Sequence, residues 1–467
     1  MQELPEKRKR SKADIRNEAL NWCKDRSAVA WSAAGYCPAT EGLFVIGGMS
    51  ELFRCGFNSA IQEREATGRF LIAIFLARIN DALAAGCRHV VLSFDCAPPR
   101  EKYMEQISRT IKMDAPPLEW NGTDPLLQLD QPLPPWDSLM ANRQARFRMI
   151  EELMVHLSQP QGRERLQLHD SETSVWLDYH KHLVELRAGS FCAFHESTHM
   201  TEDDFALFYW MRRLKDSIDG PCVCLNSDTD CITACFLYDR PLTDTTHDVI
   251  MIGAIDNASR NTDFVTYKHI NCTRLRRELL AAFPGRKAAE IGIAMVSGGG
   301  DYISAPPQVG YKNLLLALAD MDPASTPLCD VDEEGVVRHV HSRSLEVLMC
   351  TALCKRVNSA CKHGNAVSVA TTASDPMRVL LHDLIAYGRK SYLTAIKTLY
   401  AEFPRHYNNT WWYVDYVIAS ILCLPQPSGL GRGWIEDAEG HLVYPPVDRA
   451  LPAGMEDVTE KKRQRRR

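Results

Sequence analysis

The sequence predicts an α/β protein built on a mostly parallel, twisted sheet flanked by helices. Two apolar runs of strand length, GLFVIGG (42–48) and HVVLSFD (89–95), enclose a segment whose apolar residues have helical spacing. A strand, a helix and a second strand in this order favour a parallel strand pair with a helical crossover. With 467 residues, of which 45% are hydrophobic and 24% charged, the chain can bury a large core.

The other elements are predicted in chain order. Met49 to Ala85 has a helix pattern, and the proline-rich stretch from Ala115 to Trp136 excludes regular structure and indicates an insertion. Two helical segments follow, NRQARFRMIEELMVHL and VWLDYHKHLVELRAG. Next come a third strand before His195, a helix (FALFYWMRRLKDSI), a fourth strand (CVCLNSD), two hairpin or edge strands (DVIMIGAI and DFVTYKHI) and two helices (TRLRRELLAAF and AAEIGIAMVSG). From about Val340 the sequence is helical without a chemical pattern.

These elements suggest five regions. A basic tail and lead-in without a clear strand, 1–40, precedes a sheet domain, 41–290, with an insertion at about 110–180. A helical hairpin is expected over 291–340, a helical region over 341–450 and a basic tail over 451–467.

Composition and charge narrow the class of protein. No apolar run approaches the ~18 residues needed to span a bilayer, so we expect a soluble protein without a membrane partner. The net charge is −5, yet Lys7 to Lys12 and Lys461 to Arg467 are strongly basic. Such ends indicate nuclear import signals or phosphate-binding arms, or they merely solubilise the chain.

Cysteine usage indicates an intracellular protein with reduced thiols. None of the 16 cysteines has CxxC spacing, and no secretory apolar segment follows Met1. Cys222, Cys224, Cys231 and Cys235 cluster within an apolar run, which favours buried small hydrophobes over metal ligands.

Acidic residues follow several predicted strands. Asp95 closes one strand, Asp228 and Asp230 follow another, and Glu202, Asp203 and Asp204 open a helix after a third. Ligands of open parallel sheets bind beyond the carboxyl ends of the strands, where gathered carboxylates repel one another unless a cation compensates. Oxygen ligands favour Mg²⁺ or Mn²⁺, and two such ions about 4 Å apart can hydrolyse a phosphodiester.

Each acidic residue also has a structural explanation. The Glu202 group suits the first turn of a helix capped by Thr201, and Asp228 suits a turn after a strand. Their coincidence at strand ends favours metal binding.

Four segments resemble the flap endonuclease/XPG-type 5′ nucleases, whose fold is PIN-like and whose more distant relatives are 5′ exoribonucleases. FDCAPPREK (94–102) resembles the family's strand-end Asp-Gly segment, and TEDD resembles its Glu-x-Glu pair. NSDTDCIT (226–233) is similar to its Asp-x-Asp-Cys segment, and SGGGDYISAPPQVGYKNLLLAL resembles its Gly-x-Asp-Tyr segment with a helix-two-turn-helix hairpin. Order and spacing agree from about Gly42 to Ala319.

The resemblance implies a divalent-metal site that cuts nucleic acid near a 5′ end. Lys102 and Arg109 would hold the scissile phosphate, and Gly310 and Lys312 would grip the duplex backbone without reading bases. About 112–180 would take the place of the family's arch. The resemblance implies two metal ions, with ligands at Asp95, Glu202, Asp204, Asp228, Asp230 and Asp301.

The chain departs from the family in two places. Ile46 or Gly47 stands where the family has its first-strand aspartate, so one metal would lose a carboxylate. The second acidic pair is Glu202 with Asp203 or Asp204, whose side chains are shorter than the family's second glutamate. The protein would then have impaired catalysis, no catalysis, or a changed preference among metal ions. No sliding-clamp-binding peptide is evident near the C-terminus.

Two further motifs allow other interpretations. HESTH (195–199) matches the HExxH pattern of zinc hydrolases, but Ser197 and Thr198 disfavour the helix that this pattern needs, so His195 and His199 are interpreted as loop residues. FALFYW (205–210) favours core over a base-stacking platform.

Three hypotheses remain at this stage. The first is a structure-specific nuclease acting on DNA, or less strongly on RNA, and resident in the nucleus. The second is a nucleic-acid-binding protein of the same fold with impaired catalysis. The third is a zinc hydrolase.

Overall fold

The computed structural model divides the chain into two compact units. The first, here called the sheet unit, comprises Ser32–Ser227, Thr243–His269 and Cys423–Arg467; the second, the helical unit, comprises Met1–Trp31, Asp228–Leu242 and Ile270–Leu422. Each unit is described by itself. The structure describes residues 13–95, 116–179, 182–189, 192–196, 206–226, 230–237, 247–254, 266–299, 310–333, 337–360, 368, 380, 435–436 and 442–443.

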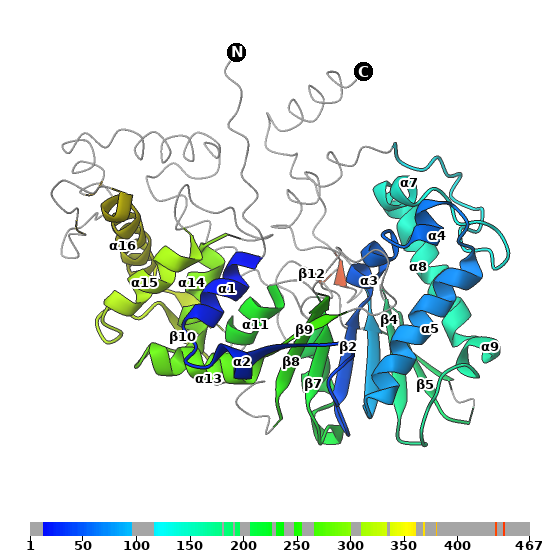
Figure 1. Cartoon of the computed structure of the whole chain (residues 1–467), viewed down its shortest axis with the longest axis horizontal. Coiled ribbons are helices and arrows are strands. Elements are labelled where there is room, and N and C mark those ends of the chain that lie inside the picture. Colours follow the sequence, from blue (N-terminus) through cyan, green and yellow to red (C-terminus); the bar gives the residue numbers. More distant parts are fainter. Residues whose placement is uncertain are drawn as a thin grey trace, which may run out of the picture. The chain divides into compact units, whose positions relative to one another are not determined.

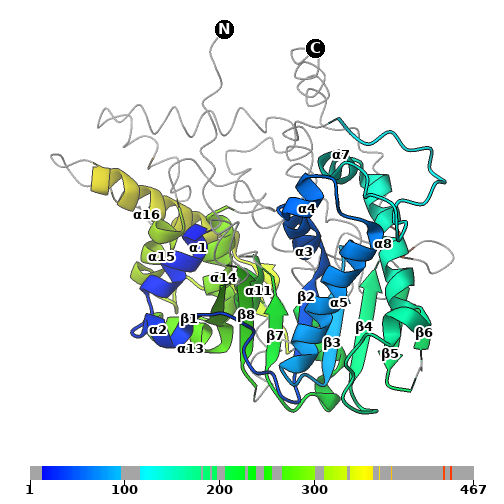
Figure 2. The same cartoon turned by 45° about the vertical axis from the view of Figure 1, so that its right-hand side comes forward.

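The described strands include a nine-stranded sheet in the order β1-β9-β8-β7-β2-β3-β4-β5-β6 (Figures 1 and 2). Its strands are β1 (Ala30–Ala33), β2 (Leu43–Gly47), β3 (His89–Ser93), β4 (Ser174–Tyr179), β5 (His182–Arg187), β6 (Cys192–Glu196), β7 (Cys222–Leu225), β8 (Val249–Ala254) and β9 (Tyr267–Asn271). Parallel pairing joins β8, β7, β2, β3 and β4, whereas β5 and β6 are antiparallel. The predicted α/β class with a mostly parallel sheet is confirmed.

The central strands are in register, so their carboxyl ends form one row. Gly47 of β2 pairs with Ser93 of β3, and Ser93 pairs with Asp178 of β4. On the other side of β2, Ile46 pairs with Leu225 of β7. Every residue of β2, β3, β4 and β7 is buried, as expected for strands covered on both faces.

Helices cover both faces of this sheet. The sheet unit contains α3 (Gly48–Cys55), α4 (Ser59–Gln62), α5 (Gly68–Ala84), α7 (Trp136–Ala141), α8 (Arg143–Ser158), α9 (Pro160–Arg163), α10 (Ala206–Arg213) and a 3-10 turn, η3 (Lys215–Ser217). Helix α5 packs on β2 and β3, α8 packs on β4, and both lie in front of the strands in Figure 1. Phe94, next to Ser93, contacts Phe75 of α5, while Asp178, the partner of Ser93, bonds to Trp210 of α10. Successive side chains of a strand point to opposite faces of the sheet, so Phe94 lies on one face and Ser93, with its partner Asp178, on the other. Helix α10 therefore covers the face opposite α5.

Several predicted elements are wrong in type or extent. VWLDYHKHLVELRAG forms the antiparallel pair β4–β5 instead of a helix. Its apolar residues alternate with polar ones, so a strand places them on one face of the sheet, whereas a helix would spread them around its surface. Since β4 belongs to the sheet, the insertion ends before Ser174. Met49–Ala85 divides into α3, α4 and α5, with Arg64 at φ 62° in the break between α4 and α5. The predicted lead-in contains β1, and β8 lies inside the sheet.

Other expectations are confirmed. Apart from a bridge between Thr67 and Pro132, described residues 116–135 form no helix or strand. All described residues of FALFYW, Ala206 to Trp210, are buried, so this run belongs to the core. The four clustered cysteines, Cys222, Cys224, Cys231 and Cys235, are also buried. Within the part of the chain that the structure describes, no helix combines the length and apolarity that crossing a bilayer requires.

The helical unit contains α1 (Ala13–Asn21), α2 (Arg26–Val29), α11 (Asp230–Leu237), α13 (Cys272–Ala282), α14 (Ala288–Ser297), α15 (Tyr311–Asp320) and α16 (Ser342–Ala360). Helix α14 packs on α11 and α15, and α15 packs on α16. The expected helical hairpin over 291–340 is only partly helical, because β10 (Cys329–Val331) pairs with β11 (Val337–Val340) in its second half. A further pair, β12 (Ile435–Glu436) and β13 (Leu442–Val443), belongs to the sheet unit and adds strands to the predicted helical region.

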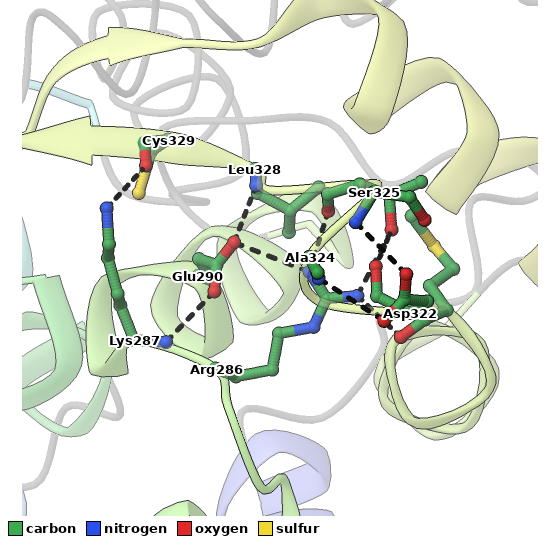
Figure 3. A network of polar contacts seen from close by, with 10 residues as sticks. Arg286, Lys287, Glu290, Asp322, Ala324, Ser325, Leu328 and Cys329 are labelled. Carbon is green, nitrogen blue, oxygen red and sulfur yellow. Dashed lines mark hydrogen bonds and ion pairs between the residues drawn. The ribbon is translucent and has the colours of Figure 1, made fainter.

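A buried ion pair ties α14 to the loop between α15 and β10 (Figure 3). Arg286 Nη1 lies 3.4 Å from Glu290 Oε1 and donates to Thr326 O at 2.7 Å. Arg286 Nη2 donates to Met321 O at 2.7 Å. Glu290 accepts from the backbone N–H of Leu328 at 2.6 Å and from that of Lys287 at 2.9 Å. Both charged groups are almost fully buried, so each compensates the desolvation of the other.

Glu290→Ala is expected to lower the free energy of unfolding by about 3 to 5 kcal/mol, because it leaves the Arg286 charge buried without its partner. Urea unfolding of the full chain measures the change. Arg338→Ala, which breaks a partly exposed pair with Asp332, is the control and should cost less than about 1 kcal/mol. Equal effects of the two variants would contradict a special role for the buried pair.

His89 forms a second buried network at the amino end of β3. Its Nδ1 lies 2.8 Å from Ser174 Oγ, and its Nε2 lies 3.0 Å from Ser217 Oγ. Because Ser217 Oγ donates to Leu214 O, Nε2 must carry the hydrogen and Nδ1 must accept from Ser174. Burial lowers the pKa of His89, with Arg88 and Arg187 acting in the same direction and Glu185 opposing them.

The folded protein is therefore expected to lose stability as the pH falls below about 6.5, because the unfolded chain binds a proton that His89 resists in the fold. Thermal melting between pH 8 and pH 5 tests this. His89→Gln should melt at a lower temperature at pH 8 but lose less on acidification than the wild type. His339→Gln, at an exposed position, should keep the wild-type pH dependence; an unchanged pH profile in His89→Gln would rule His89 out as its source.

Candidate functional site

The carboxyl ends of β7, β2, β3 and β4 form one edge of the sheet unit, here called the crest. Asn226 follows β7 at this edge, Gly47 ends β2, and Ser93 and Asp178 lie near the ends of β3 and β4. Asp95 lies two residues beyond β3 and is partly exposed. The crest is where an open parallel sheet presents its ligand-binding groups.

The end of β2 carries no metal ligand. Ile46 is fully buried, and Gly47 ends the strand immediately before α3. The next position is also closed: a Cβ at Gly48 would lie 2.7 Å from the Phe94 ring and 2.7 Å from Ser93 O. The end of β2 thus presents a buried isoleucine and a glycine, and the assignment of this position to a metal ligand in the family stays a prediction.

A hydrogen bond between neutral groups lies next to this gap. Ser50, in the first turn of α3, donates its hydroxyl to Asn226 Oδ1 at 3.1 Å. Asn226 is fully buried, and its backbone N–H donates to Ile252 O at 3.0 Å. Asn226 is thereby held at the point where the chain continues to Asp228, which lies outside the described residues.

Helix α3 is anchored below the crest by a buried carboxylate. Glu51, only 1% exposed, lies 2.8 Å from Arg54 Nη1 and 3.2 Å from Arg78 Nε of α5. Arg78 Nη1 also donates to Tyr267 OH at 3.3 Å. These contacts couple α3, α5 and β9, so the backbone at the end of β2 has little freedom to move.

Arg146 of α8 interacts electrostatically with Asp95. Burial lowers the pKa of Arg146, Asp95 opposes that effect, and Arg143 adds to it. Arg146 Nη1 donates to Met140 O at 2.7 Å, and its guanidinium carbon lies 5.9 Å from the centre of the Phe147 ring. Arg146 Nε is buried and has no hydrogen-bond partner among the described residues.

Asp178 is a second acidic residue at the crest. It is 1% exposed, and its Oδ2 accepts from Trp210 Nε1 at 3.1 Å. Its backbone oxygen accepts from the N–H of Phe94 at 2.9 Å, which holds the chain just before Asp95. Asp178 therefore positions the end of β3.

In the helical unit, the described candidates are Asp230, Gly310 and Lys312. Asp230 is the first residue of α11 and is 8% exposed, in the first turn where the helix dipole favours a negative charge. Gly310 caps α15, and Lys312 is exposed in the first turn of that helix. An exposed lysine at a helix start suits contact with a phosphate.

Tyr311, in the first turn of α15, contacts the glycines that follow α14. Its hydroxyl donates to Gly299 O, and a Cβ at Gly298 would lie 2.2 Å from its ring. Gly298 is therefore needed because the ring lies against the backbone, and Gly299 has a φ of 97°, which favours glycine.

Most of the candidate ligands lie outside the described residues: Glu202, Asp203, Asp204, Asp228 and Asp301, together with the basic residues Lys102 and Arg109. Asp95 belongs to the sheet unit and Asp230 to the helical unit, so their meeting stays a prediction. Among the residues that are described, no group of three histidine, cysteine or acidic side chains could hold a metal ion.

The interpretation of His195 as a loop residue is wrong. His195 and Glu196 lie in β6, which pairs with β5, and His195 Nε2 lies 3.7 Å from Glu185 Oε2. An HExxH zinc site needs its first histidine and glutamate on a helix. His195 and Glu196 therefore do not lie on the helix that the zinc hydrolase hypothesis requires. His199 lies outside the described residues.

Sequence inspection missed Arg146, Asp178 and Tyr311. Arg146 and Asp178 lie in segments without a motif; strand register brings Asp178 to the crest, and Arg146 is identified by its electrostatic interaction with Asp95. Tyr311 stands within the GYKN segment, where the adjacent Gly-rich run is a signal that could have indicated close packing of an aromatic ring.

No protein-family model matches the chain, and no curated protein matches it in sequence. Among solved structures, it is similar to the catalytic core of Rad2 in two complexes with DNA substrate. The match to complex III has 15% sequence identity and a TM-score of 0.32, and it covers 61% of this chain. The match to complex II has 12% sequence identity and a TM-score of 0.31, and it covers 77% of this chain. The chain spans 63% of the Rad2 core in complex III and 75% in complex II.

It is also similar to the bacteriophage T5 D15 flap endonuclease in a pseudo-enzyme-product complex with DNA and metal ions. That match has 10% identity and a TM-score of 0.33, and it covers 74% of this chain and 99% of the other. These are similarities to solved structures, and the chemistry of this chain is decided by its own residues.

Proposed function

We propose that the protein is a divalent-metal-dependent nuclease that hydrolyses phosphodiester bonds of DNA near a 5′ end or a junction of single and double strands. The observation that carries this proposal is the common edge formed by β3 and β7. Asp95 follows β3 there, and β7 leads through the buried Asn226 toward Asp228. Carboxylates at one sheet edge are the ligand type that Mg²⁺ and Mn²⁺ prefer.

The reaction needs one water molecule and no other reactant. A bond forms between the water oxygen and phosphorus while the bond from phosphorus to the leaving sugar oxygen breaks; the water loses a proton and the leaving oxygen gains one. A bound Mg²⁺ or Mn²⁺ would supply an activated water and stabilise developing negative charge. The proposed metal ligands on this chain are Asp95, Glu202, Asp204 or Asp203, Asp228, Asp230 and Asp301.

The substrate class rests on the residues that carry positive charge. Lys312, at the exposed start of α15, would contact phosphates without reading bases, and Lys102 and Arg109 are proposed to hold the scissile phosphate. The resemblance of the four segments to 5′ nucleases favours DNA, with RNA as the second choice.

One observation favours a second candidate, a nucleic-acid-binding protein with impaired catalysis. The end of β2 has no carboxylate, and the Phe94 ring and Ser93 O fill the space that a side chain at Gly48 would need. A site with one ligand fewer binds its cation more weakly. Both candidates predict binding that weakens strongly with salt, because phosphate contacts release counterions.

Asp228→Asn is expected to reduce cleavage of labelled 5′-flap DNA by at least about 100-fold in Mg²⁺ or Mn²⁺, because it removes a negative metal ligand. Gel assays under single-turnover conditions, with single-stranded RNA in parallel, measure the rate. Asp219→Asn is the matched control. Asp219 is exposed and precedes β7 at the opposite end of the strands, so its loss should leave the rate unchanged.

The two candidates give different outcomes. Metal-dependent cleavage that Asp228→Asn abolishes supports the nuclease. Salt-sensitive binding without cleavage in either metal supports the impaired protein and sinks the nuclease, and absence of both binding and cleavage rejects both.

We also propose that the protein resides in the nucleus, on the basis of the basic clusters at residues 7–12 and 461–467, which lie outside the described residues. A fluorescent fusion of the full chain should accumulate in nuclei. Replacing the basic residues of 461–467 by alanine should reduce that accumulation; unchanged distribution in a variant lacking both clusters would refute the proposal.

A further inference from the structure

Asp178 contacts two elements that lead to proposed metal ligands. Its backbone oxygen accepts from the N–H of Phe94 at 2.9 Å, and Phe94 is the residue before Asp95. Its side chain accepts from Trp210 Nε1 of α10 at 3.1 Å. Asp178 is 1% exposed and Trp210 is fully buried, so this hydrogen bond lies in a medium of low dielectric constant, where it is stronger than in water.

Helix α10 runs from the crest towards the amino ends of the strands. Trp210 contacts Asp178 near the carboxyl end of β4. After α10 ends at Arg213, Ser217 Oγ lies 3.0 Å from His89 Nε2 at the start of β3. The later part of this segment is therefore at the amino ends of the strands, and the first turn of α10 is at the end nearer the crest.

Two contacts hold Trp210 on β4. Trp176 and Asp178 alternate along this strand, so their side chains point to the same face of the sheet. The Trp210 ring lies 5.3 Å from the Trp176 ring, and Trp210 Nε1 bonds to Asp178. Ring packing allows sliding, whereas a hydrogen bond requires a short distance and a straight angle. The bond to Asp178 therefore fixes the position of α10 along β4.

The acidic residues 202–204, here called the acidic segment, come directly before α10 in the chain. Asp204 precedes Ala206, the first residue of α10, by two positions, which span roughly 7 Å at most. Ala206 lies about 6 Å from Trp210 along the helix axis, on the side of the crest. The bond between Trp210 and Asp178 therefore limits how far Asp204 can lie from the end of β3.

We propose that Asp178 is a positioning residue of the metal site: the hydrogen bonds that it accepts from Phe94 and Trp210 set the spacing between Asp95 and the acidic segment. This role rests on the proposed function and adds to it a residue outside the four motif segments. Partners of this kind hold metal ligands in place, and their loss commonly costs about 10- to 100-fold in metal affinity or activity.

Binding of Mn²⁺ tests this role without reference to activity. In calorimetric titration of the metal-free full chain, Asp178→Ala and Trp210→Phe are each expected to bind Mn²⁺ about 10-fold more weakly than the wild type. The double variant should bind no more weakly than the weaker single variant, because both changes remove the same hydrogen bond. Losses that multiply in the double variant would overturn a role through this bond.

Two further variants separate positioning from general damage to the core. Asp178→Asn keeps an oxygen that can accept from Trp210 Nε1, so it should recover most of the affinity that Asp178→Ala loses. Trp176→Phe is the matched control, because Trp176 is a buried indole on the same face whose Nε1 has no hydrogen-bond partner among the described residues. It should keep the wild-type affinity for Mn²⁺ even where urea unfolding shows lower stability.

Either of two results would overturn the role. If Asp178→Asn binds Mn²⁺ as weakly as Asp178→Ala, the hydrogen bond does not position the ligands. If Trp176→Phe weakens binding as much as Trp210→Phe, disturbed packing explains both losses.

Single-turnover cleavage of 5′-flap DNA gives a second measurement. In Asp178→Ala and Trp210→Phe, the Mn²⁺ concentration that gives half the maximal rate should rise by the same factor as the dissociation constant, because the ligands are held less well. Asp178→Asn and Trp176→Phe should need the wild-type concentration. An unchanged Mn²⁺ dependence in all four variants would contradict the role of Asp178.

The outcomes distinguish the role of Asp178 from the proposed function. Wild-type Mn²⁺ binding and cleavage that Asp178→Ala and Trp210→Phe leave unchanged overturn the positioning role and leave the nuclease standing. A wild-type chain that binds no Mn²⁺ and cleaves nothing overturns the nuclease, and the role of Asp178 with it.

Discussion

The in-register parallel pairing of β7, β2, β3 and β4 is the constraint on which the rest of the sheet unit depends. It aligns the strand ends so that Gly47, Ser93 and Asp178 stand in one row, with Asn226 following β7 beside them. A shift by one residue would turn every side chain of a strand to the other face. The chemistry proposed for the crest therefore depends on backbone hydrogen bonds made several residues away from it.

Charge compensation is the second organising theme. Glu51 is buried between Arg54 and Arg78, and Glu290 is buried against Arg286, while Asp95 raises the pKa of Arg146 against the effect of burial. The first two pairs also bond to backbone or side-chain groups and hold helices in place. Arg146 bonds to Met140 O, and its Nε, like that of Arg286, has no hydrogen-bond partner among the described residues.

The Gly-rich segment before Asp301 shows how packing and chemistry share residues. Gly298 lies against the Tyr311 ring, and the hydroxyl of that ring donates to Gly299 O. A motif that resembles part of a nuclease thus also serves packing, because it joins the end of α14 to the start of α15. The same glycines would be required even if the protein only bound nucleic acid.

The α/β class, the strands around residues 45, 91 and 223, and the missing aspartate at Ile46 and Gly47 follow from the sequence alone, because continuous apolar runs and their ends are local signals. It could not determine that 174–187 pairs as two strands, that His195 lies in β6, or that Asp178 bonds to Trp210. Those features depend on partners distant in the chain: strand register and helix packing decide which side chains meet. The local preference for helix in 174–187 gives way to the burial that β3 provides.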